Sequence, residues 1–413
     1  MYLYYFFAAI VIWLGIVSLR GGIRFAQYVR RETARALPDF TPFASILAPF
    51  RGLDQGLREN IAALFDQDYP AYELIFVTDR VDDPAIAVIE DLEHSVRDAP
   101  HLSSAGKRIA ARTIIAGPAT DSGQKVHNLR VAVREIDSRT EVLVFVDTDA
   151  RPHSRWLRSI VEPLQDERIG AATGYRWFVP VGGGFASHLR SVWNASIASA
   201  LGASEEKNFC WGGSTAIRRE TFERLSIRKR WQGTVSDDFT LTRALQEEKL
   251  PIHFVPACLT ASLEDCTLRE LFEFTTRQLK ITRAYASHLW KAALIGSLLF
   301  SLVFFGGLVL VSIRAILELT FVIPLALLCL IFVLGAAKAY IRLSAVSIPL
   351  ASYRSQLRRG LLAQVFLWPI ASALFLYNSL AAAASSRISW RGITYELKSP
   401  TEAVIIRGTD FSL

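Results

Sequence analysis

The chain has 413 residues, of which 51% are hydrophobic, and its 46 lysines and arginines exceed its 39 acidic residues to give a net charge of +7. This hydrophobic content is high for a wholly soluble protein of this length, so we expect one part in lipid and another folded outside it. The four cysteines show no CxxC spacing, which argues against a zinc site or a disulfide framework.

The first apolar run, from Tyr2 to Leu19, contains no charged residue, and several arginines follow it from Arg20 onward. It is long enough to cross a hydrocarbon core of about 30 Å at about 1.5 Å per residue, so we predict a transmembrane anchor over 1–20. No basic residue precedes the run and no small-x-small site precedes Arg20, which disfavours a cleaved signal peptide. The positive-inside rule then predicts that the following residues face the cytosol.

The region 37–288 contains short β-rich runs separated by polar helical segments, which is typical of an α/β domain with a mainly parallel sheet covered on both faces. The expected strands are 44–49, 73–78, 112–116, 141–146, 171–178 and 252–255. The expected helices are 56–65, 84–95, 125–135 and 236–247. In such sheets ligands bind beyond the carboxyl ends of the strands, so polar residues there are the first candidates for chemistry.

Two of the expected strands lead into carboxylates, Asp79 after one and Asp147 and Asp149 after the other. A carboxylate at the end of an apolar strand is costly unless it meets solvent, a cation or a hydrogen-bond donor. Asp79 alone is equally consistent with a turn or a helix cap. The i, i+2 spacing of Asp147 and Asp149 can direct two carboxylates at one hard cation. We therefore predict that they hold Mg²⁺ or Mn²⁺ together with the diphosphate of a donor.

A third acidic site is Ser236, Asp237 and Asp238, which taken alone is also what an ordinary helix N-cap looks like. Its position downstream of the other carboxylates is the order that sugar transfer requires. A metal ion neutralises a departing nucleotide diphosphate, and a separate carboxylate takes the proton of the acceptor hydroxyl. We predict Asp238 as the general base and Asp237 as a supporting acid, and one base without a covalent nucleophile implies inversion.

The stretch 268–288 mixes basic and apolar residues, which is consistent with a helix on an anionic membrane surface and equally with an ordinary packed helix. Two apolar stretches then predict a transmembrane hairpin over 291–340, with a basic loop after it on the cytosolic side. A third apolar stretch, 361–384, precedes a tail at 385–413 that is also basic. A full crossing would place that charge outside, so crossing and a re-entrant or interfacial segment both stay open.

The segments around these residues resemble the ceramide glucosyltransferase-like family of glycosyltransferases, which have a GT-A fold. The resemblance covers roughly 38–288 and a short Arg391-Gly392-x-x-Tyr395 segment in the tail. It implies that Asp79 contacts the uracil of a nucleotide, with Asp83 in the same binding segment. It also implies that Lys125 and Asn128 bind the donor, with the lysine at the diphosphate.

The resemblance continues through Cys210 and Gly213, which match the family's small-residue loop beside the acceptor, and through Asp238, which matches its general base. Arg277 and Lys280 fall where the family has an R-x-x-R-W or Q-x-x-R-W signature that binds acceptor and diphosphate, and Arg283, three residues on, is a candidate to compensate for the lost arginine. Lysine here keeps the charge but loses the planar fork, and Ile281 replaces the tryptophan. This departure puts the usual acceptor contact in doubt and argues against a processive polysaccharide synthase.

We therefore expect an integral membrane glycosyltransferase whose catalytic domain faces the cytosol and moves a sugar, of glucose type, from a UDP-sugar to a lipid such as ceramide. A polysaccharide synthase of the same fold is one alternative. A catalytically silent membrane scaffold or transporter is another, disfavoured because Asp79, Asp149 and Asp238 are all present. The basic residues cluster beside the apolar segments, so we predict an anionic membrane surface as a partner and no nucleic acid.

Overall fold

The computed structural model describes residues 1–36, 38–98 and 109–407, which form two compact units. One unit, here called the sheet unit, comprises Glu32–Trp177, Leu201–Leu263 and Ser386–Leu413. The other, here called the helical unit, comprises Met1–Arg31, Phe178–Ala200 and Glu264–Ser385. The C-terminal tail thus belongs to the same unit as the region that carries the predicted carboxylates.

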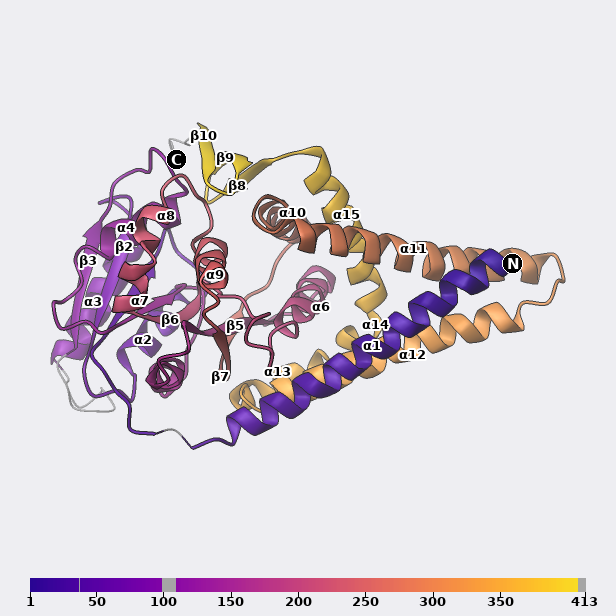
Figure 1. Ribbon diagram of the computed structural model, residues 1–413, viewed down its shortest axis with the longest axis horizontal. Coiled ribbons are helices and arrows are strands. Elements are labelled where there is room, and N and C mark those ends of the chain that lie inside the picture. The colour runs from indigo at the N-terminus through magenta and orange to yellow at the C-terminus, as the bar shows by residue number, and fades with distance from the viewer. Residues whose placement is uncertain (37, 99–108, 408–413) are drawn as a thin grey trace. The chain divides into compact units, whose positions relative to one another are not determined.

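The sheet unit is built on a seven-stranded sheet in the order β3-β2-β1-β4-β6-β5-β7 (Figure 1). Its strands are β1 (Ala44–Pro49), β2 (Tyr72–Thr78), β3 (Ala110–Ile115), β4 (Val142–Val146), β5 (Ala171–Val179), β6 (Ser214–Arg218) and β7 (Ile252–Leu263). The first four pair in parallel, whereas β6 is antiparallel to both β4 and β5. The predicted α/β class with a mainly parallel sheet is confirmed.

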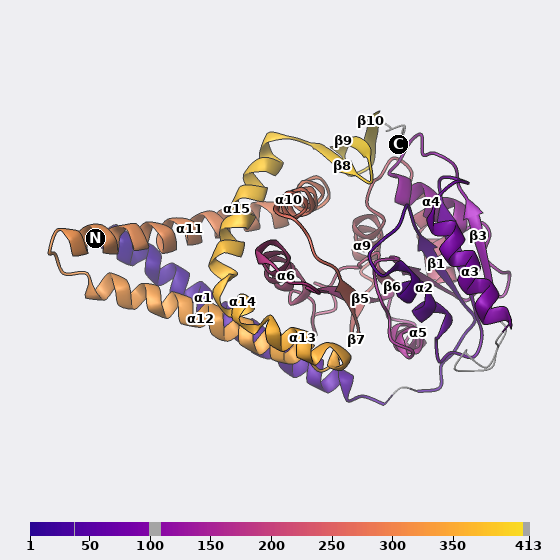
Figure 2. The same ribbon diagram turned by 180° about the vertical axis from the view of Figure 1, so that it is seen from behind.

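Helices cover both faces of this sheet (Figures 1 and 2). One face packs against α2 (Leu57–Phe65), α3 (Ala85–Asp98) and α5 (Trp156–Val161). The other packs against α4 (Gln124–Ala132), α7 (Arg219–Arg224), α8 (Ile227–Arg230) and α9 (Asp237–Glu247). Successive side chains of a strand alternate between faces, so Ile46 of β1 joins the first core and Leu47 the second.

The strand order reverses beside β1, because β2 and β3 lie on one side of it and β4 on the other. Since β1, β2 and β4 are parallel, their carboxyl ends meet at one edge of the sheet. The loops that follow these three strands therefore border a crevice of the kind in which open α/β sheets bind ligands.

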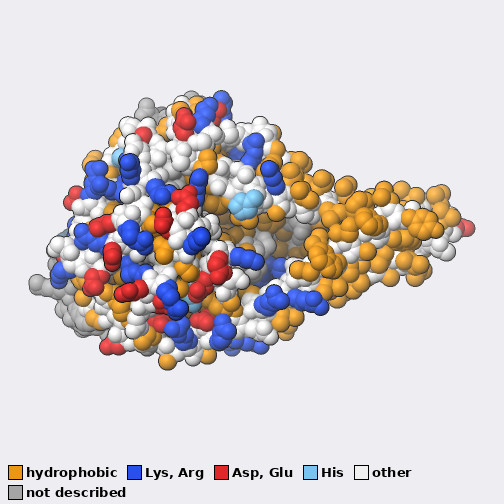
Figure 3. Space-filling model, in the orientation of Figure 1, with side chains coloured by type: hydrophobic (Ala, Val, Ile, Leu, Met, Phe, Trp, Pro, Cys, Tyr) orange, Lys and Arg blue, Asp and Glu red, His pale blue; other side chains and the backbone are white. Residues whose placement is uncertain are grey.

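The helical unit contains three helices long and apolar enough to cross a membrane: α1 (Tyr2–Thr33), α11 (Ser287–Ile316) and α12 (Val322–Val346). Hydrophobic side chains cover the surface over these helices (Figure 3). The unit's other helices are α6 (Phe185–Ala198), α10 (Leu268–Tyr285), α13 (Arg354–Arg359), α14 (Leu361–Phe366) and α15 (Trp368–Ala384). Long apolar helices at the N-terminus and in the C-terminal part are confirmed.

The third C-terminal apolar stretch is two helices, because α14 ends at Phe366 and α15 begins with Pro369 in its first turn (Figures 1 and 2). Proline fits the first turn of a helix, where its missing N–H costs nothing, but not the interior. In α15 the buried Asn378 accepts hydrogen bonds from Thr275 at 3.2 Å and Thr276 at 3.0 Å of α10. This polar contact anchors α15 on a protein surface.

The described part of the tail forms a three-stranded antiparallel sheet of β8 (Arg387–Trp390), β9 (Ile393–Ser399) and β10 (Glu402–Arg407). Its buried Tyr395 hydroxyl accepts a hydrogen bond of 3.1 Å from the backbone N–H of Gln124, at the start of α4. The tail is therefore an integral layer of the sheet unit.

Candidate active site

Asp79 lies directly after β2, as the sequence predicts, and only 8% of it is exposed. Its Oδ2 is 3.6 Å from Nη1 of Arg51, which follows β1. Within the described residues its buried Oδ1 has no hydrogen-bond partner. A buried carboxylate oxygen that lacks a donor is costly, and a ligand N–H at this position would satisfy it. This is what contact with a nucleotide base would provide.

Lys125, in the first turn of α4, joins two of the predicted carboxylates. Its Nζ lies 2.7 Å from Oδ1 of Asp147 and 3.3 Å from Oδ1 of Asp237. Burial disfavours the charged amine, but the negative charges of Asp147, Asp237 and Asp238 outweigh burial and raise the pKa of Lys125. The lysine is therefore a fixed positive charge among acids from two separate segments of the chain, the loop after β4 and the start of α9.

Asp147 and Asp149 lie side by side after β4 and share Arg176 of β5. This guanidinium lies 3.3 Å from Oδ2 of Asp147 and 2.9 Å from Oδ2 of Asp149. It also lies over the ring of Trp211, 4.9 Å from the ring centroid. The two carboxylates thus share one guanidinium in this structure, and their predicted role as metal ligands stays a prediction.

The donor set at Asp147 and Asp149 fits a hard divalent cation that keeps other ligands. Among the described residues no group of three or more histidine, cysteine or acidic side chains is placed to hold a metal ion by itself. Mg²⁺ commonly binds through one or two carboxylates plus substrate phosphates and water, without a full protein cage. These two aspartates would therefore hold such an ion once the phosphates of a donor are present.

Asp237, in the first turn of α9, is buried between Lys125 and the loop at Gly212. A Cβ on Gly212 would lie 2.2 Å from Oδ2 of Asp237, so only glycine allows the chain this close. Burial, opposed by Lys125 and reinforced by the charges of Asp238 and Asp147, raises the pKa of Asp237 to about 6. The folded protein therefore binds a proton at Asp237 more readily than the unfolded chain does.

The pH dependence of stability should report this raised pKa. The stabilisation that Asp237 contributes is fully present below its unfolded pKa of about 4 and is lost as the pH rises through about 6. Asn at this position stays neutral, so Asp237→Asn should melt at a higher temperature than wild type at pH 8, with the difference shrinking towards pH 4. Thermal unfolding of the purified chain in EDTA measures this. Equal melting temperatures across the range would contradict the burial argument.

Asp238 follows at the start of α9, where Ser236 caps the helix by accepting the N–H of Phe239 at 3.3 Å. Oδ1 of Asp238 accepts the same N–H at 2.7 Å and also accepts the hydroxyl of Ser236. The helix-cap interpretation is therefore correct for Ser236. The carboxylate of Asp238 is held in one orientation beside the buried cluster, and its charge acts on Lys125.

The remaining predicted site residues of the sheet unit have structural contacts. Asp83 caps α3 through the N–H of Ala85 and accepts from the loop after β1, and Asn128 donates to the carbonyl of Val77 at 3.4 Å. Cys210 is fully buried, which raises the pKa of its thiol. A Cβ on Gly213 would overlap the Trp211 ring at 2.2 Å. Binding roles for these four residues stay predictions.

Arg277 and Lys280 lie on α10 of the helical unit, where the guanidinium of Arg277 lies 5.6 Å from the ring centroid of Phe274. Arg283, three residues after Lys280, donates to the carbonyl of Ala382 at 2.7 Å, near the end of α15. That arginine therefore has a structural contact, and the acceptor role of Arg277 and Lys280 stays a prediction.

Sequence reasoning missed Arg51 and Arg176, and it did not single out Trp211 or Gly212 within the small-residue loop. The sequence does contain an indication of Arg176, because it is the one charged residue in the nine-residue strand β5. The glycine adjoining Asp237 belongs to the predicted small-residue loop, but the sequence does not say which of its two glycines meets the carboxylate.

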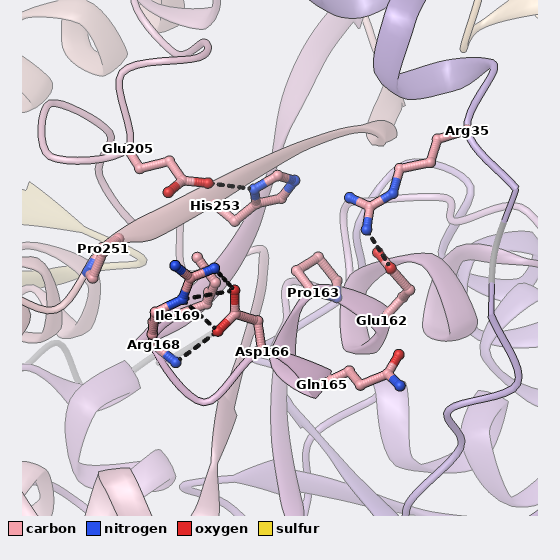
Figure 4. A pocket seen from close by; sticks show the side chains of 10 residues that line it. All are labelled: Arg35, Glu162, Pro163, Gln165, Asp166, Arg168, Ile169, Glu205, Pro251 and His253. Atoms are coloured by element: carbon pink, nitrogen blue, oxygen red, sulfur yellow. Dashed lines mark hydrogen bonds and ion pairs between the residues drawn. The ribbon is translucent and has the colours of Figure 1, made fainter.

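A pocket of about 490 Å³ elsewhere in the sheet unit contains none of the predicted site residues (Figure 4). Its lining residues are Arg35, Glu162, Pro163, Gln165, Asp166, Arg168, Ile169, Glu205, Pro251 and His253. Most of its charged groups are already paired, with Arg35 to Glu162 at 3.0 Å and His253 to Glu205 at 2.8 Å. The candidate active site is therefore the carboxylate cluster at the ends of the strands.

Comparison with known proteins gives several likenesses. A ceramide glucosyltransferase of Komagataella phaffii is 30% identical over 97 residues, which is 23% of this chain and 18% of that protein. A mannosyltransferase from Pyrobaculum calidifontis, solved with GDP-Man and Mn²⁺, is 17% identical over 92% of this chain and 98% of that one, with a TM-score of 0.46. A glucosyl-3-phosphoglycerate synthase from Mycobacterium tuberculosis, solved with Mn²⁺ and UDP-glucose, is 14% identical over 63% and 83%, with a TM-score of 0.36.

A family model covers nearly the whole chain. Residues 4–403, which include nearly all of the three long apolar helices, the seven-stranded sheet and the tail as far as the start of β10, match the model of glycosyl transferase family 21. The predicted resemblance to the ceramide glucosyltransferase family is confirmed by this match, and the sheet agrees with the expected GT-A type of fold. The chain is a glycosyltransferase and belongs to glycosyl transferase family 21.

Proposed function

We propose that the protein is an inverting transferase that moves a sugar from a UDP-sugar to the hydroxyl of a membrane lipid such as ceramide. The observation that carries this proposal is the convergence of Asp147 and Asp237 on the amine of Lys125. It brings together a strand-end carboxylate pair suited to a diphosphate-bound cation and a helix that carries a second acidic pair. A transferase needs both kinds of group within reach of one sugar.

The proposed role of each residue follows from its position at the ends of the strands. Asp79 and Arg51, at the ends of β2 and β1, receive the base of the nucleotide. Asp147 and Asp149 would hold Mg²⁺ or Mn²⁺, which would neutralise charge on the diphosphate. Lys125 supplies a fixed positive charge beside them.

In the reaction the acceptor oxygen bonds to the anomeric carbon while the bond from that carbon to the diphosphate oxygen breaks and its electron pair leaves with the diphosphate. The proton of the acceptor hydroxyl passes to the carboxylate of Asp238. A single displacement of this kind inverts the configuration of the sugar.

A lipid acceptor is supported by the three helices that are long and apolar enough to cross a bilayer, because they would hold the sheet unit at a membrane surface. We place that unit on the cytosolic side, because Arg20, Arg24, Arg30 and Arg31 follow the apolar part of α1.

The position of the tail indicates whether the third C-terminal apolar stretch, 361–384, crosses the membrane. If α11 and α12 both cross, the chain returns after α12 to the side on which α11 began. The tail that follows α15 packs within the sheet unit through Tyr395, so it lies on that same side. We therefore propose that α14 and α15 form a re-entrant or interfacial segment and do not cross the membrane.

Single-cysteine labelling with an impermeant reagent tests this topology. Cysteines at Ser355, before α14, and at Ser389, in β8, should label only from the cytosolic side, and one at Leu319, between α11 and α12, only from the other side. All three positions are exposed in the structure. Labelling of the Ser355 and Ser389 positions from opposite sides would show that the segment crosses.

The protein into which these single cysteines are introduced first needs two of its own cysteines replaced. Cys266 is half-buried and Cys329 is exposed, so both are replaced by serine, whereas Cys210 and Cys258 are buried and stay protected in the folded chain. Retained activity of the background shows that the labelled protein is folded.

The function itself is tested by incubating membranes that contain the chain with a panel of radiolabelled UDP-sugars, with and without Mn²⁺ or Mg²⁺. We expect a labelled lipid in the organic extract, formed only with metal. A labelled polymer that stays out of the extract would favour a polysaccharide synthase. No product with any donor and acceptor would favour a catalytically silent scaffold.

A further inference from the structure

The β8–β9 hairpin of the tail turns through a residue that is unfavourable there. Trp390 pairs with Ile393, so the turn consists of Arg391 and Gly392, with φ angles of +49° and +81°. Two-residue turns with positive φ at both positions favour Asn-Gly, because side chains other than Asn, Asp and Gly are strained there. Backbone strain of this kind is commonly kept where a side chain has a function.

The side chain of Arg391 reaches the loop after β1, where it forms an ion pair with Oδ1 of Asp54. The other oxygen of Asp54 accepts a hydrogen bond of 3.3 Å from the hydroxyl of Thr148. Thr148 is the residue between Asp147 and Asp149. Arg391 is therefore linked through Asp54 alone to the side chain of Thr148, within the predicted metal and diphosphate site.

The charge of Arg391 is directed at that site. Burial opposes the charged guanidinium, but the negative charges of Asp54, Asp149 and Asp147 outweigh it and raise the pKa of Arg391. The side chain of Arg391 is 42% exposed, so its guanidinium is accessible to a ligand while it is paired with Asp54. A partly exposed arginine that pairs with Asp54 and whose charge interacts with Asp147 and Asp149 is suited to bind an anion that arrives with a metal ion.

The hairpin that carries Arg391 is fixed on the sheet unit. Tyr395, four residues on, is 1% exposed and bonded to the first residue of α4, next to Lys125. A Cβ on Gly233 would lie 2.2 Å from the carbonyl oxygen of Thr401, so the tail also approaches the loop before α9 very closely. The hairpin therefore presents Arg391 from a rigid support.

We propose that Arg391 binds the diphosphate of the donor, with the C-terminal hairpin completing a site otherwise built from the loops after β1 and β4 and from Lys125. This inference rests on the proposed function, in that the ligand is the diphosphate of a nucleotide sugar. The planar guanidinium donates two parallel hydrogen bonds to phosphate oxygens. When the bond to the anomeric carbon breaks and its electron pair leaves with the diphosphate, Arg391 stabilises the added negative charge.

Arg391→Asn separates binding from folding, because it creates the Asn-Gly turn that this hairpin geometry favours. The variant should melt at or above the wild-type temperature, yet bind the diphosphate less tightly. Loss of a charge-assisted contact predicts roughly 10- to 100-fold weaker binding. The matched control is Lys398→Ala, on β9 of the same hairpin, whose amine pairs with Glu396 at 2.9 Å. It should bind as wild type does.

The measurement is calorimetric titration of the full chain in detergent with three probes in the presence of Mn²⁺: inorganic pyrophosphate, UDP and uridine. We expect Arg391→Asn to weaken pyrophosphate and UDP alike and to leave uridine unchanged. Arg391→Lys, which keeps the charge without the fork, should fall between. Wild-type affinity for pyrophosphate in the Asn variant would overturn the proposal, and so would an equal loss for uridine, which indicates a general structural effect.

The same titration separates this inference from the proposed function. A wild-type chain that binds pyrophosphate but not UDP contradicts the uridine donor, while the Asn variant still tests Arg391 on pyrophosphate. A wild-type chain that binds neither probe contradicts both.

Discussion

Asp238→Asn should abolish sugar transfer while leaving UDP bound as tightly as in the wild type. Asn has the shape of Asp and can still accept the N–H of Phe239, which Asp238 accepts at 2.7 Å, so the start of α9 should keep its structure. The amide of Asn cannot take a proton from the acceptor hydroxyl. Loss of a general base costs about 10²- to 10⁴-fold in rate. Transfer of label into lipid and titration with UDP measure the two properties separately.

The neighbouring carboxylate provides the contrast for this experiment. Asp237→Asn keeps an oxygen that can accept from Lys125 but removes the negative charge 3.3 Å from its amine, so it should change donor binding as well as slow transfer. If Asp238→Asn loses UDP binding instead, Asp238 belongs to the donor site. If Asp237→Asn alone abolishes transfer at saturating donor, the base is Asp237.

Three strands of the parallel half, β1, β2 and β4, could be predicted closely because they are mainly apolar runs, whereas β3 includes Arg112 and was expected two residues late. β1 was predicted at its observed bounds, and β2 and β4 to within one residue. β6 was not predicted, because Ser214–Arg218 is short and mixes polar and apolar residues, and antiparallel pairing with β4 stabilises it. The three strands of the tail were missed because their sequence was interpreted only by its charge.

The carboxylates of the candidate site could be predicted because a charged residue after an apolar strand can be recognised from the sequence alone. Their cationic partners could not, because pairing depends on how the strands are ordered. Arg176 meets Asp147 and Asp149 only because β5 lies next to β6, and β6 next to β4. Arg391 is 337 residues from Asp54 in the chain, a separation at which no local pattern indicates contact.

The guanidinium of Arg176, which pairs with Asp147 and Asp149, indicates how the binding of metal and the binding of donor should be coupled. Arg176 bonds to Oδ2 of each carboxylate, so a divalent ion that takes both aspartates competes with the guanidinium for them. A metal ion that arrives with a diphosphate gains phosphate ligands as well, which favours the exchange. We therefore expect metal and nucleotide to bind tightly together and weakly apart.

Asp149→Ala should reduce the affinity for UDP in Mn²⁺ to the level that the wild type shows in EDTA. The variant keeps Asp147, which Lys125 and Arg176 both engage, but one carboxylate paired with two cations is a poor ligand for a divalent ion. The loss should be about 100-fold if the ion contributes as much as a buried charged contact. Asp166→Ala, an exposed aspartate that pairs with Arg168 at 2.7 Å in the same unit, is the matched control and should bind as wild type. Affinity that is the same in Mn²⁺ and EDTA for the wild type would remove the metal from the mechanism, whereas a metal-dependent affinity that survives in Asp149→Ala would place the ion on other ligands.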